Sequence, residues 1–449
     1  MRRFIILTVI LGCCGLASVP GSSFAAESAR AHEIEARLAG ALQLKDLLAY
    51  AYESNPSITA SRESWNAFIE NYRVGKSYPD PQLMTTFFPK PLETRLGPQD
   101  WNLNFSQVIP FPGKLSQKGK VLKAQADIAK LKLDKTVRDI ITSVSRSFYE
   151  LVYIQKAIGV ARANLDINRQ LSAISENAYA GDKALFYDVS KALAQTAQIR
   201  YDIILLEELE QTEKTKLNSL LNRAPEAPLG RAVPLPARKV VYSLDQIYEL
   251  ASFFQEDIRI ADVAVKKSQE TVRLARYENL PTFKLGLFYA GIGNPDVASP
   301  PKDAGDDAVG VQVGVNIPLW FGKNISRTAK AKALEAQARA QKQVKINAVR
   351  SKISRMWFKL QSSSRLITLY EKDLLPEAMS SLGTAETWFR EGKGSFSDYL
   401  EIQATAYNFQ LSLARARADY AENLALLEQL AGVILDRKVP ATNKGGGKQ

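Results

Sequence analysis

The sequence QVIPFPGK occupies residues 107–114, and the related sequence VNIPLWFGK occupies residues 315–323. Each follows a short stretch in which apolar and polar residues alternate, and each precedes a much longer run with the spacing of a helix. The chain therefore repeats one order of elements: strands, a proline–aromatic elbow, then a long helix. An internal repeat of this kind constrains the architecture before any single residue is considered.

The repeat extends through most of the chain. LKDLLAYAYESNPSI at 44–58 aligns without a gap with LDQIYELASFFQEDI at 244–258, and the turn at 179–188 aligns with 389–398. We predict a duplication with repeats at 26–224 and 242–435 and a flexible tail at 436–449. The linker at 225–241 is rich in proline, which favours an extended path over a helix; its prolines are Pro225, Pro228, Pro234 and Pro236.

The amino terminus has the pattern of a secretory signal peptide. Arg2 and Arg3 precede an apolar run, and a small-residue cleavage site follows at 23–25. We therefore predict that residues 1–25 are removed and that the mature chain is exported. An alternative processing site at 10–13 would leave Cys13 lipidated, but the signal would then be unusually short, so cleavage near Ala25 is the preferred interpretation.

Composition argues against catalysis. Both cysteines, Cys13 and Cys14, lie in the signal, and the only histidine is His32. A mature chain cleaved near Ala25 then has no thiolate and too few ligands for a typical zinc site. A histidine-dependent triad would have to use His32, close to the new amino terminus. We expect no enzyme activity, no catalytic residue, no metal site and no cofactor.

The chain is basic. Its formal charge of +12 falls to about +10 without Arg2 and Arg3. Because an exported chain does not routinely meet nucleic acid, we expect no nucleic-acid partner. The spread of single Lys and Arg residues favours solvated helix faces, with acidic partner surfaces as a further option.

Four segments have the period-two alternation of strands. Val309, Val311 and Val313 alternate with Gly310 and Gln312 in the clearest of them. An apolar face opposite a polar face is typical of strands in an outer-membrane barrel, although a soluble antiparallel sheet has the same pattern. We predict strands at about 82–88, 100–109, 282–290 and 308–317, with loops at 89–100 and 291–307 outside the cell.

Four strands cannot close a barrel by themselves. Open strand edges in lipid would leave backbone groups without hydrogen bonds. We therefore expect subunits to join, and geometry alone permits two or three.

The helices are long enough to cross a compartment. No proline lies between Pro112 and Pro225, and a helix at about 114–179 would extend roughly 100 Å. We predict further helices at 185–222, at 323–390 with a break near Pro376, and at 396–435. The predicted fold is mostly α with a membrane β-barrel portion and long coiled-coil helices.

The order of these elements resembles the TolC-like outer-membrane factors, the exit ducts of tripartite efflux pumps and type I secretion systems. The two elbows, Leu374-Leu375-Pro376 and the two turns at 179–188 and 389–398 carry the resemblance, which covers 44–435. The segment ETRLGPQ at 93–99 also resembles the branch that serves heavy-metal cation pumps.

The resemblance implies a homotrimer in the outer membrane, surrounded by lipid, with a 12-stranded barrel and a tube of 12 helices in the periplasm. It implies two partners, an inner-membrane pump and a periplasmic adaptor that meets the helix-turn tips at Gly181, Lys183, Gly392 and Lys393. The expected function is passive conduction of substrates, metal cations or drugs, to the exterior. A type I secretion duct and a periplasmic coiled-coil scaffold remain alternatives, and the sequence does not identify the substrate.

In such ducts the narrowest point lies at the periplasmic tips, and acidic side chains commonly line it. Asp398 and Glu401 lie one helical turn apart, and Asp188 occupies the matching position of the first repeat, so these three residues are gate candidates. Ser395 followed by Asp398 also has the spacing of a helix cap, which would explain Asp398 without a gate.

The elbows have two interpretations. Their aromatic residues would form an interfacial girdle where strands leave the bilayer, or would only pack the junction, while the glycines permit the turn into the helix. The elbow residues are Pro110, Phe111, Gly113, Pro318, Trp320, Phe321 and Gly322.

Overall fold

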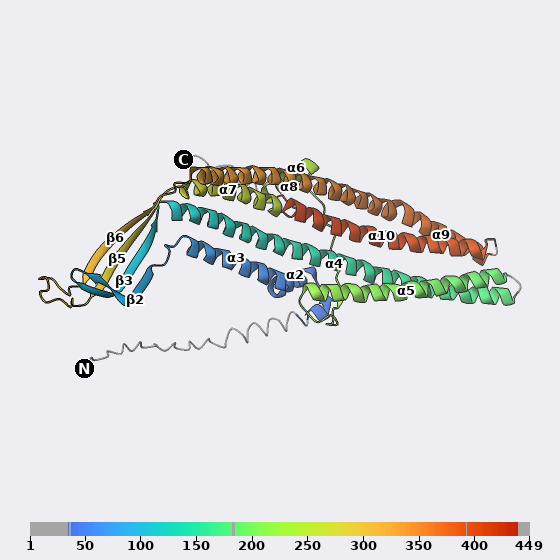
Figure 1. Ribbon diagram of the computed structural model, residues 1–449. Helices are drawn as coiled ribbons and strands as arrows, with labels where there is room; N and C mark the ends of the chain where they lie inside the picture. Colours follow the sequence, from blue (N-terminus) through green and yellow to red (C-terminus); the bar gives the residue numbers. More distant parts are fainter. Residues whose placement is uncertain (1–34, 36, 182–184, 392, 439–449) are drawn as a thin grey trace, which may run out of the picture.

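The protein is elongated, with a sheet at one end and helices that run away from it (Figure 1). The computed structural model describes residues 35, 37–181, 185–391 and 393–438 of the chain. The predicted signal, His32, Lys183, Gly392 and the end of the chain beyond 438 lie outside the described residues. No helix within the described residues has the length and apolar composition that a membrane span requires.

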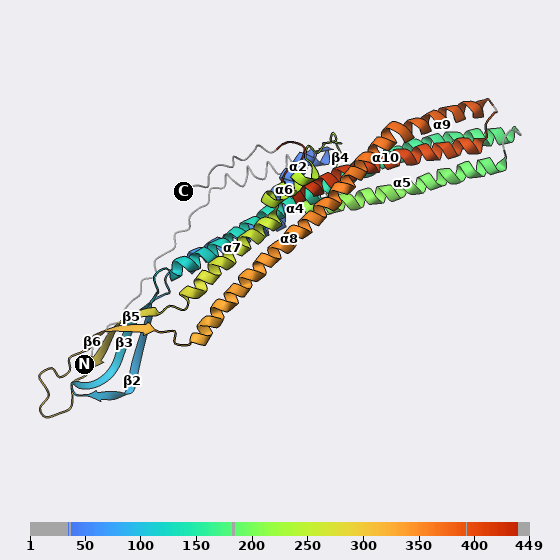
Figure 2. The ribbon, with the colours of Figure 1, turned by 90° about the horizontal axis from the view of Figure 1, so that it is seen from above.

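The helices occur in the same order in both repeats. Two shorter helices precede each strand pair and long helices follow it (Figure 2). The first repeat contains α2 (Leu44–Ser54), α3 (Pro56–Gly75), α4 (Lys114–Ala180) and α5 (Phe186–Leu220). The second contains α6 (Leu244–Phe254), α7 (Glu256–Tyr277), α8 (Phe321–Leu369), a π-helix η1 (Tyr370–Leu374), α9 (Leu375–Arg390) and α10 (Phe396–Ala431).

One antiparallel sheet joins the strand pairs of the two repeats. Its order is β2 (Gln82–Thr94), β3 (Gly97–Pro110), β5 (Thr282–Ile292) and β6 (Ala308–Asn316). Within the described chain, β2 and β6 each have one partner strand and one unpaired edge. The linker contributes a second, small sheet, in which β4 (Arg231–Ala232) pairs in parallel with β1 (Ala41–Leu42).

The predicted loop at 89–100 is wrong. β2 and β3 continue through most of it, with Leu92 opposite Gln99 and Thr94 opposite Gly97, so that the connection is a tight turn. Proline is tolerated at positions 89 and 91 because β2 is an edge strand and its register shifts between Phe87 and Leu92. The second pair keeps a longer connection between Ile292 and Ala308.

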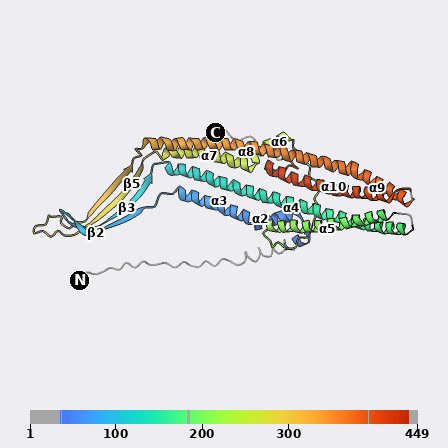
Figure 3. The same ribbon diagram turned by 45° about the vertical axis from the view of Figure 1, so that its right-hand side comes forward.

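The two helical cores are built from equivalent positions. In the first repeat α2 packs on α4, where Val144, Phe148 and Leu151 are fully buried. Counted from the two Gly-Lys pairs, Val144 corresponds to Ile353, which is buried under α6 in the second repeat. Burying one such side chain stabilises the fold by roughly 1.5–3 kcal/mol. The short helices α2 and α6 therefore pack against the long helices α4 and α8 along the middle part of their length (Figure 3).

The second repeat has a local irregularity in its long helix. Tyr370–Leu374 form a π-helix, and Pro376 follows in the first turn of α9. Proline lacks the N–H that a helix interior needs, and a π-bulge takes up the resulting mismatch. This irregularity lies next to Pro376, near which a break is predicted from the sequence.

Candidate functional site

The sheet has one apolar and one polar face. On β6 the side chains of Val309, Val311 and Val313 are 71–76% exposed. On the other face the amide of Asn104 donates to Gln312 Oε1 at 2.7 Å. Nothing else in the described chain covers this row of exposed valines, which lies beside an unpaired strand edge. An exposed apolar row on a strand is typical of a lipid-facing surface.

The two elbows differ in their backbone. Gly113 caps the start of α4 with φ +87°, a left-handed conformation that favours glycine. A β-carbon on Gly113 would lie 3.0 Å from the ring of Tyr277. Gly322 instead lies inside α8, has no positive φ, and has open space at the corresponding position. The expectation that both glycines are needed for the turn is therefore wrong for Gly322.

The remaining elbow residues divide between strand and helix. Pro110 ends β3 opposite Thr282, and Phe111 is half-buried beside it. Pro318 accepts a hydrogen bond from the side-chain amide of Asn324 through its backbone carbonyl. Trp320 and Phe321 are 76% and 75% exposed at the start of α8. These two rings therefore do not pack the junction within one chain.

At the tips, a helix-capping hydrogen bond and exposed acidic side chains occur in the same turn. Ser395 Oγ accepts from the Asp398 backbone N–H at 3.0 Å, which is a helix cap. Both carboxylates, Asp398 and Glu401, are nevertheless exposed. In the first repeat Asp188 accepts from the Leu185 N–H at 3.3 Å, so its carboxylate is held back against its own helix end.

The two tips of one chain lie side by side. Lys191 Nζ on α5 donates to Ser397 Oγ on α10. Phe396 and Tyr399 pack with Leu171 and Ala192 in one buried cluster. A movement of one tip must therefore carry the other with it.

The tip candidates from the sequence have local partners. Lys393 pairs with Glu391 at 2.8 Å. The Gly181 N–H donates to the Asn177 carbonyl at 3.2 Å, which ends α4. Both residues therefore lie at the ends of long helices, as the repeated turns predict.

Midway along the tube, a charge network joins α4 and α10. Arg415 donates to the Glu150 carboxylate and lies 3.2 Å from Glu422. Arg146 forms a second ion pair with Glu422, at 3.3 Å. Burial and the neighbouring Glu150 raise the pKa of Glu422 above its usual range. This network could not be found from the sequence, because its members come from two distant segments.

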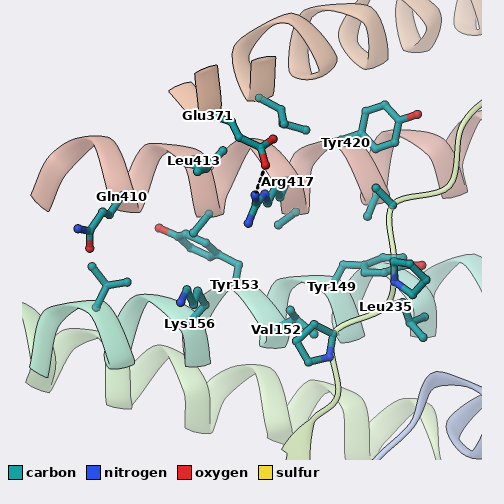
Figure 4. Close-up of a pocket in the computed structure, with 18 of the residues that line it drawn as sticks. Tyr149, Val152, Tyr153, Lys156, Leu235, Glu371, Gln410, Leu413, Arg417 and Tyr420 are labelled. Atoms are coloured by element: carbon teal, nitrogen blue, oxygen red, sulfur yellow. Dashed lines mark hydrogen bonds and ion pairs between the residues drawn. The ribbon is translucent and has the colours of Figure 1, made fainter. Parts of the chain in front are cut away.

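A cavity of about 890 Å³ lies beside this network. Its walls come from α4, α10, the π-helix region and the linker at 234–238, and Arg417 pairs with Glu371 across it at 3.0 Å (Figure 4). Tyr149, Tyr153 and Leu235 supply much of its apolar lining. Within the described residues, no group of three His, Cys, Asp or Glu side chains is placed to hold a metal ion.

Residues 249–433, nearly the whole second repeat, match the family described as outer membrane efflux protein. This part of the chain belongs to the outer membrane efflux protein family. A comparison with curated proteins finds no match. Members of this family are efflux channels of the outer membrane and not enzymes, which confirms the expectation that this efflux protein is not an enzyme.

Solved structures share the fold of this efflux protein. It is similar to CusC, with TM-score 0.74 and 17% identity over 88% of this chain and 92% of that chain. It is also similar to VceC of Vibrio cholerae, with TM-score 0.72 and 19% identity over 87% and 96%. The Campylobacter jejuni outer membrane channel CmeC gives TM-score 0.71 and 13% identity over 87% and 85%. The predicted fold class is confirmed. The family description of the second repeat agrees with the predicted outer-membrane location.

Proposed function

We propose that three copies of this chain form a passive exit duct, which receives substrates from an inner-membrane pump through a periplasmic adaptor. One observation carries the proposal: a four-stranded sheet with an exposed valine row and two unpaired edges stands at the end of helices that extend roughly 100 Å. Joining β6 of one copy to β2 of the next pairs both edges, and three copies give twelve strands.

The adaptor would meet the tips. The turns after α4 and α9 end the long helices of the two repeats, and each chain presents both side by side. Three chains then present six similar tips, which matches a sixfold arrangement of adaptor subunits. Exposed Asp398 and Glu401 would form acidic rings there that favour cations and resist opening.

The pump would choose the substrate and the duct would conduct it. The similarities to CusC and to VceC are of the same degree, and neither identifies the substrate. The mature sequence has Met84, Met356 and Met379 and no cysteine after position 14, which is a poor donor set for a relay of soft metal ions along the tube.

Conductance of the purified protein in a planar bilayer tests the proposal. We expect a heat-resistant trimer with stable single-channel currents. Val311→Arg, on the exposed apolar face, should reduce barrel stability by about 2–4 kcal/mol if it lies near the bilayer midplane. Gln312→Arg, the next residue on the opposite face, should assemble normally and change ion selectivity. A monomer without currents, recovered in the soluble periplasmic fraction, would instead support the scaffold alternative.

A further inference from the structure

The start of α8 carries an exposed apolar surface, which we name the elbow patch. Its side chains are 62–76% exposed although they are large and apolar. The patch consists of Ile317, Leu319, Trp320, Phe321 and Ile325. It lies directly where the strands end, so it continues the apolar face of the sheet onto the first turn of the helix.

Basic residues follow the elbow in both repeats. Residues 114–126 and 321–334 each contain four Lys or Arg and no Asp or Glu. Counted from the Gly-Lys pairs, Lys114 corresponds to Lys323, Lys118 to Arg327, and Lys123 to Lys332. Lys118, Lys123, Lys323 and Lys332 are all exposed. The same charge pattern thus occurs at both crossings from sheet to helix.

These charges have few internal partners. Arg327 donates to Asn279 Oδ1 at 2.6 Å and lies 3.5 Å from the Glu278 carboxylate. No described acid lies within ion-pair distance of the four exposed lysines. Neither α4 nor α8 has an acid in its first turn. Because helix starts favour acids and disfavour cations, the position of Lys323 in the first turn of α8 is electrostatically costly unless an outside anion completes it.

The patch belongs to the outer wall of the tube. Ile325, Lys332, Arg339, Ile346 and Ile353 recur every seven residues along α8. Farther down this stripe, Ile346 and Ile353 pack in the core beneath α6. A short helix that crosses the wall of a duct must lie outside its lumen, so the uncovered upper part of the stripe faces outward as well.

We propose that the elbow patch binds anionic glycerophospholipids in the leaflet that faces the helices. The aromatic and aliphatic side chains of the patch enter the acyl region, and the lysines of both repeats contact the phosphates and acidic headgroups. Trp320 and Phe321 lie at the level of the interface. Side chains on a helix lean toward its amino terminus, so the long side chain of Lys332 can extend toward that level. This inference rests on the proposed membrane duct, since it needs a bilayer around the sheet.

Native mass spectrometry of the detergent-purified trimer tests the proposal. The protein is offered equal amounts of phosphatidylglycerol and phosphatidylcholine, and the two bound populations are compared. The wild type should retain phosphatidylglycerol preferentially. The variant K118Q/K123Q/K323Q/K332Q should lower that preference by at least about tenfold, because each surface cation contributes several-fold in affinity for an anionic lipid.

The matched control removes four exposed cations farther down α8, in K352Q/R355Q/K359Q/R365Q. It changes the net charge equally and should keep the wild-type preference. Equal retention of both lipids by the wild type, or equal loss in the two variants, overturns the proposal. A thermal stabilisation by inorganic phosphate as large as that by phosphatidylglycerol also overturns it, because the site would then hold a free anion.

Conductance in a zwitterionic bilayer separates this inference from the proposed function. Currents from the wild type without any lipid preference refute only the lipid site. Failure of the wild type to insert and conduct refutes the duct, and the lipid site with it.

Discussion

The guanidinium of Arg415 on α10 donates to the carboxylate of Glu150 on α4 at 2.6 Å. The same guanidinium lies 2.6 Å from Asp419 and stacks on the ring of Tyr153, 4.6 Å from its centroid. This side chain therefore links α4 of the first repeat to α10 of the second near the middle of the tube. Its nearest further acid is Glu422, at 3.2 Å.

Arg415→Met should destabilise the protein by about 2–3 kcal/mol, because it removes hydrogen bonds to charged groups and leaves Glu150 and Glu422 facing each other. Thermal unfolding of the purified protein measures the loss. Glu422→Gln in the same background should recover part of it, because one of the two charges is then absent. An Arg415→Met protein as stable as the wild type would contradict this assignment.

The loss should depend on pH. Burial and Glu150 raise the pKa of Glu422, so the folded chain takes up a proton more readily than the unfolded chain. The favourable contribution of that proton is present at low pH and is lost as pH rises above the usual value of 4.5. Without Arg415 the carboxylates repel more strongly once ionised. The Arg415→Met protein should therefore lose more stability at pH 8 than at pH 5. An equal loss at the two pH values would contradict the predicted direction of this pH dependence.

The double variant Asp398→Asn, Glu401→Gln should raise single-channel conductance or reduce cation preference, because it removes exposed negative charge at the tips. Ser395→Ala is the matched control. It deletes the cap oxygen that accepts from the Asp398 N–H, and should cost about 1 kcal/mol of stability without altering conductance. If the double variant conducts as the wild type does, the two acids have no gating role and only stabilise the start of the helix.

The sequence predicts the elements well where a local pattern determines them. The repeated elbows, the valine alternation of β6 and the proline-free course of α4 all result from local backbone and side-chain preferences. The turn between β2 and β3 could not be predicted, because Pro89 and Pro91 normally end a strand and only the edge position of β2 admits them.

Contacts between segments far apart in the chain could not be predicted from the sequence. Lys191 and Ser397 form a hydrogen bond although they lie in different repeats. Nothing in the sequence around either residue indicates that the two are partners. The acids Asp398 and Glu401 could be found, because a repeated turn marks their place. Whether they face a lumen depends on neighbouring copies, so their gating role stays a prediction.

Gly113→Val should impair folding and trimer assembly, whereas Gly322→Val should be tolerated much better. The left-handed backbone of Gly113 disfavours a β-branched residue by about 1–3 kcal/mol, and the new side chain meets Tyr277. Gly322 has ordinary helical geometry and open space around it. Yields of heat-resistant trimer on gels compare the two directly, and equal yields would show that the backbone of the first elbow is not critical.

A buried polar layer joins α4 and α10 closer to the tips. Gln403 Nε2 donates to Asn164 Oδ1 at 2.8 Å, and both side chains are at least 95% buried. Gln403 Oε1, Asn164 Nδ2 and the Tyr407 hydroxyl find no hydrogen-bond partner among the described residues. Burial also raises the pKa of Tyr407 to about 12, so the hydroxyl stays neutral.

Replacing one member of this pair should cost more than replacing both. Gln403→Met alone leaves Asn164 Oδ1 with only the longer bond from Asn168 Nδ2 at 3.3 Å, and losing the 2.8 Å donor should cost about 1 kcal/mol. Adding Asn164→Leu removes that acceptor, and Asn168 keeps its bond to the Asn164 backbone carbonyl at 3.0 Å. The double variant should therefore melt at or above the temperature of Gln403→Met. A double-mutant cycle from thermal unfolding measures the coupling, and strictly additive losses would mean that the two amides stabilise the layer independently.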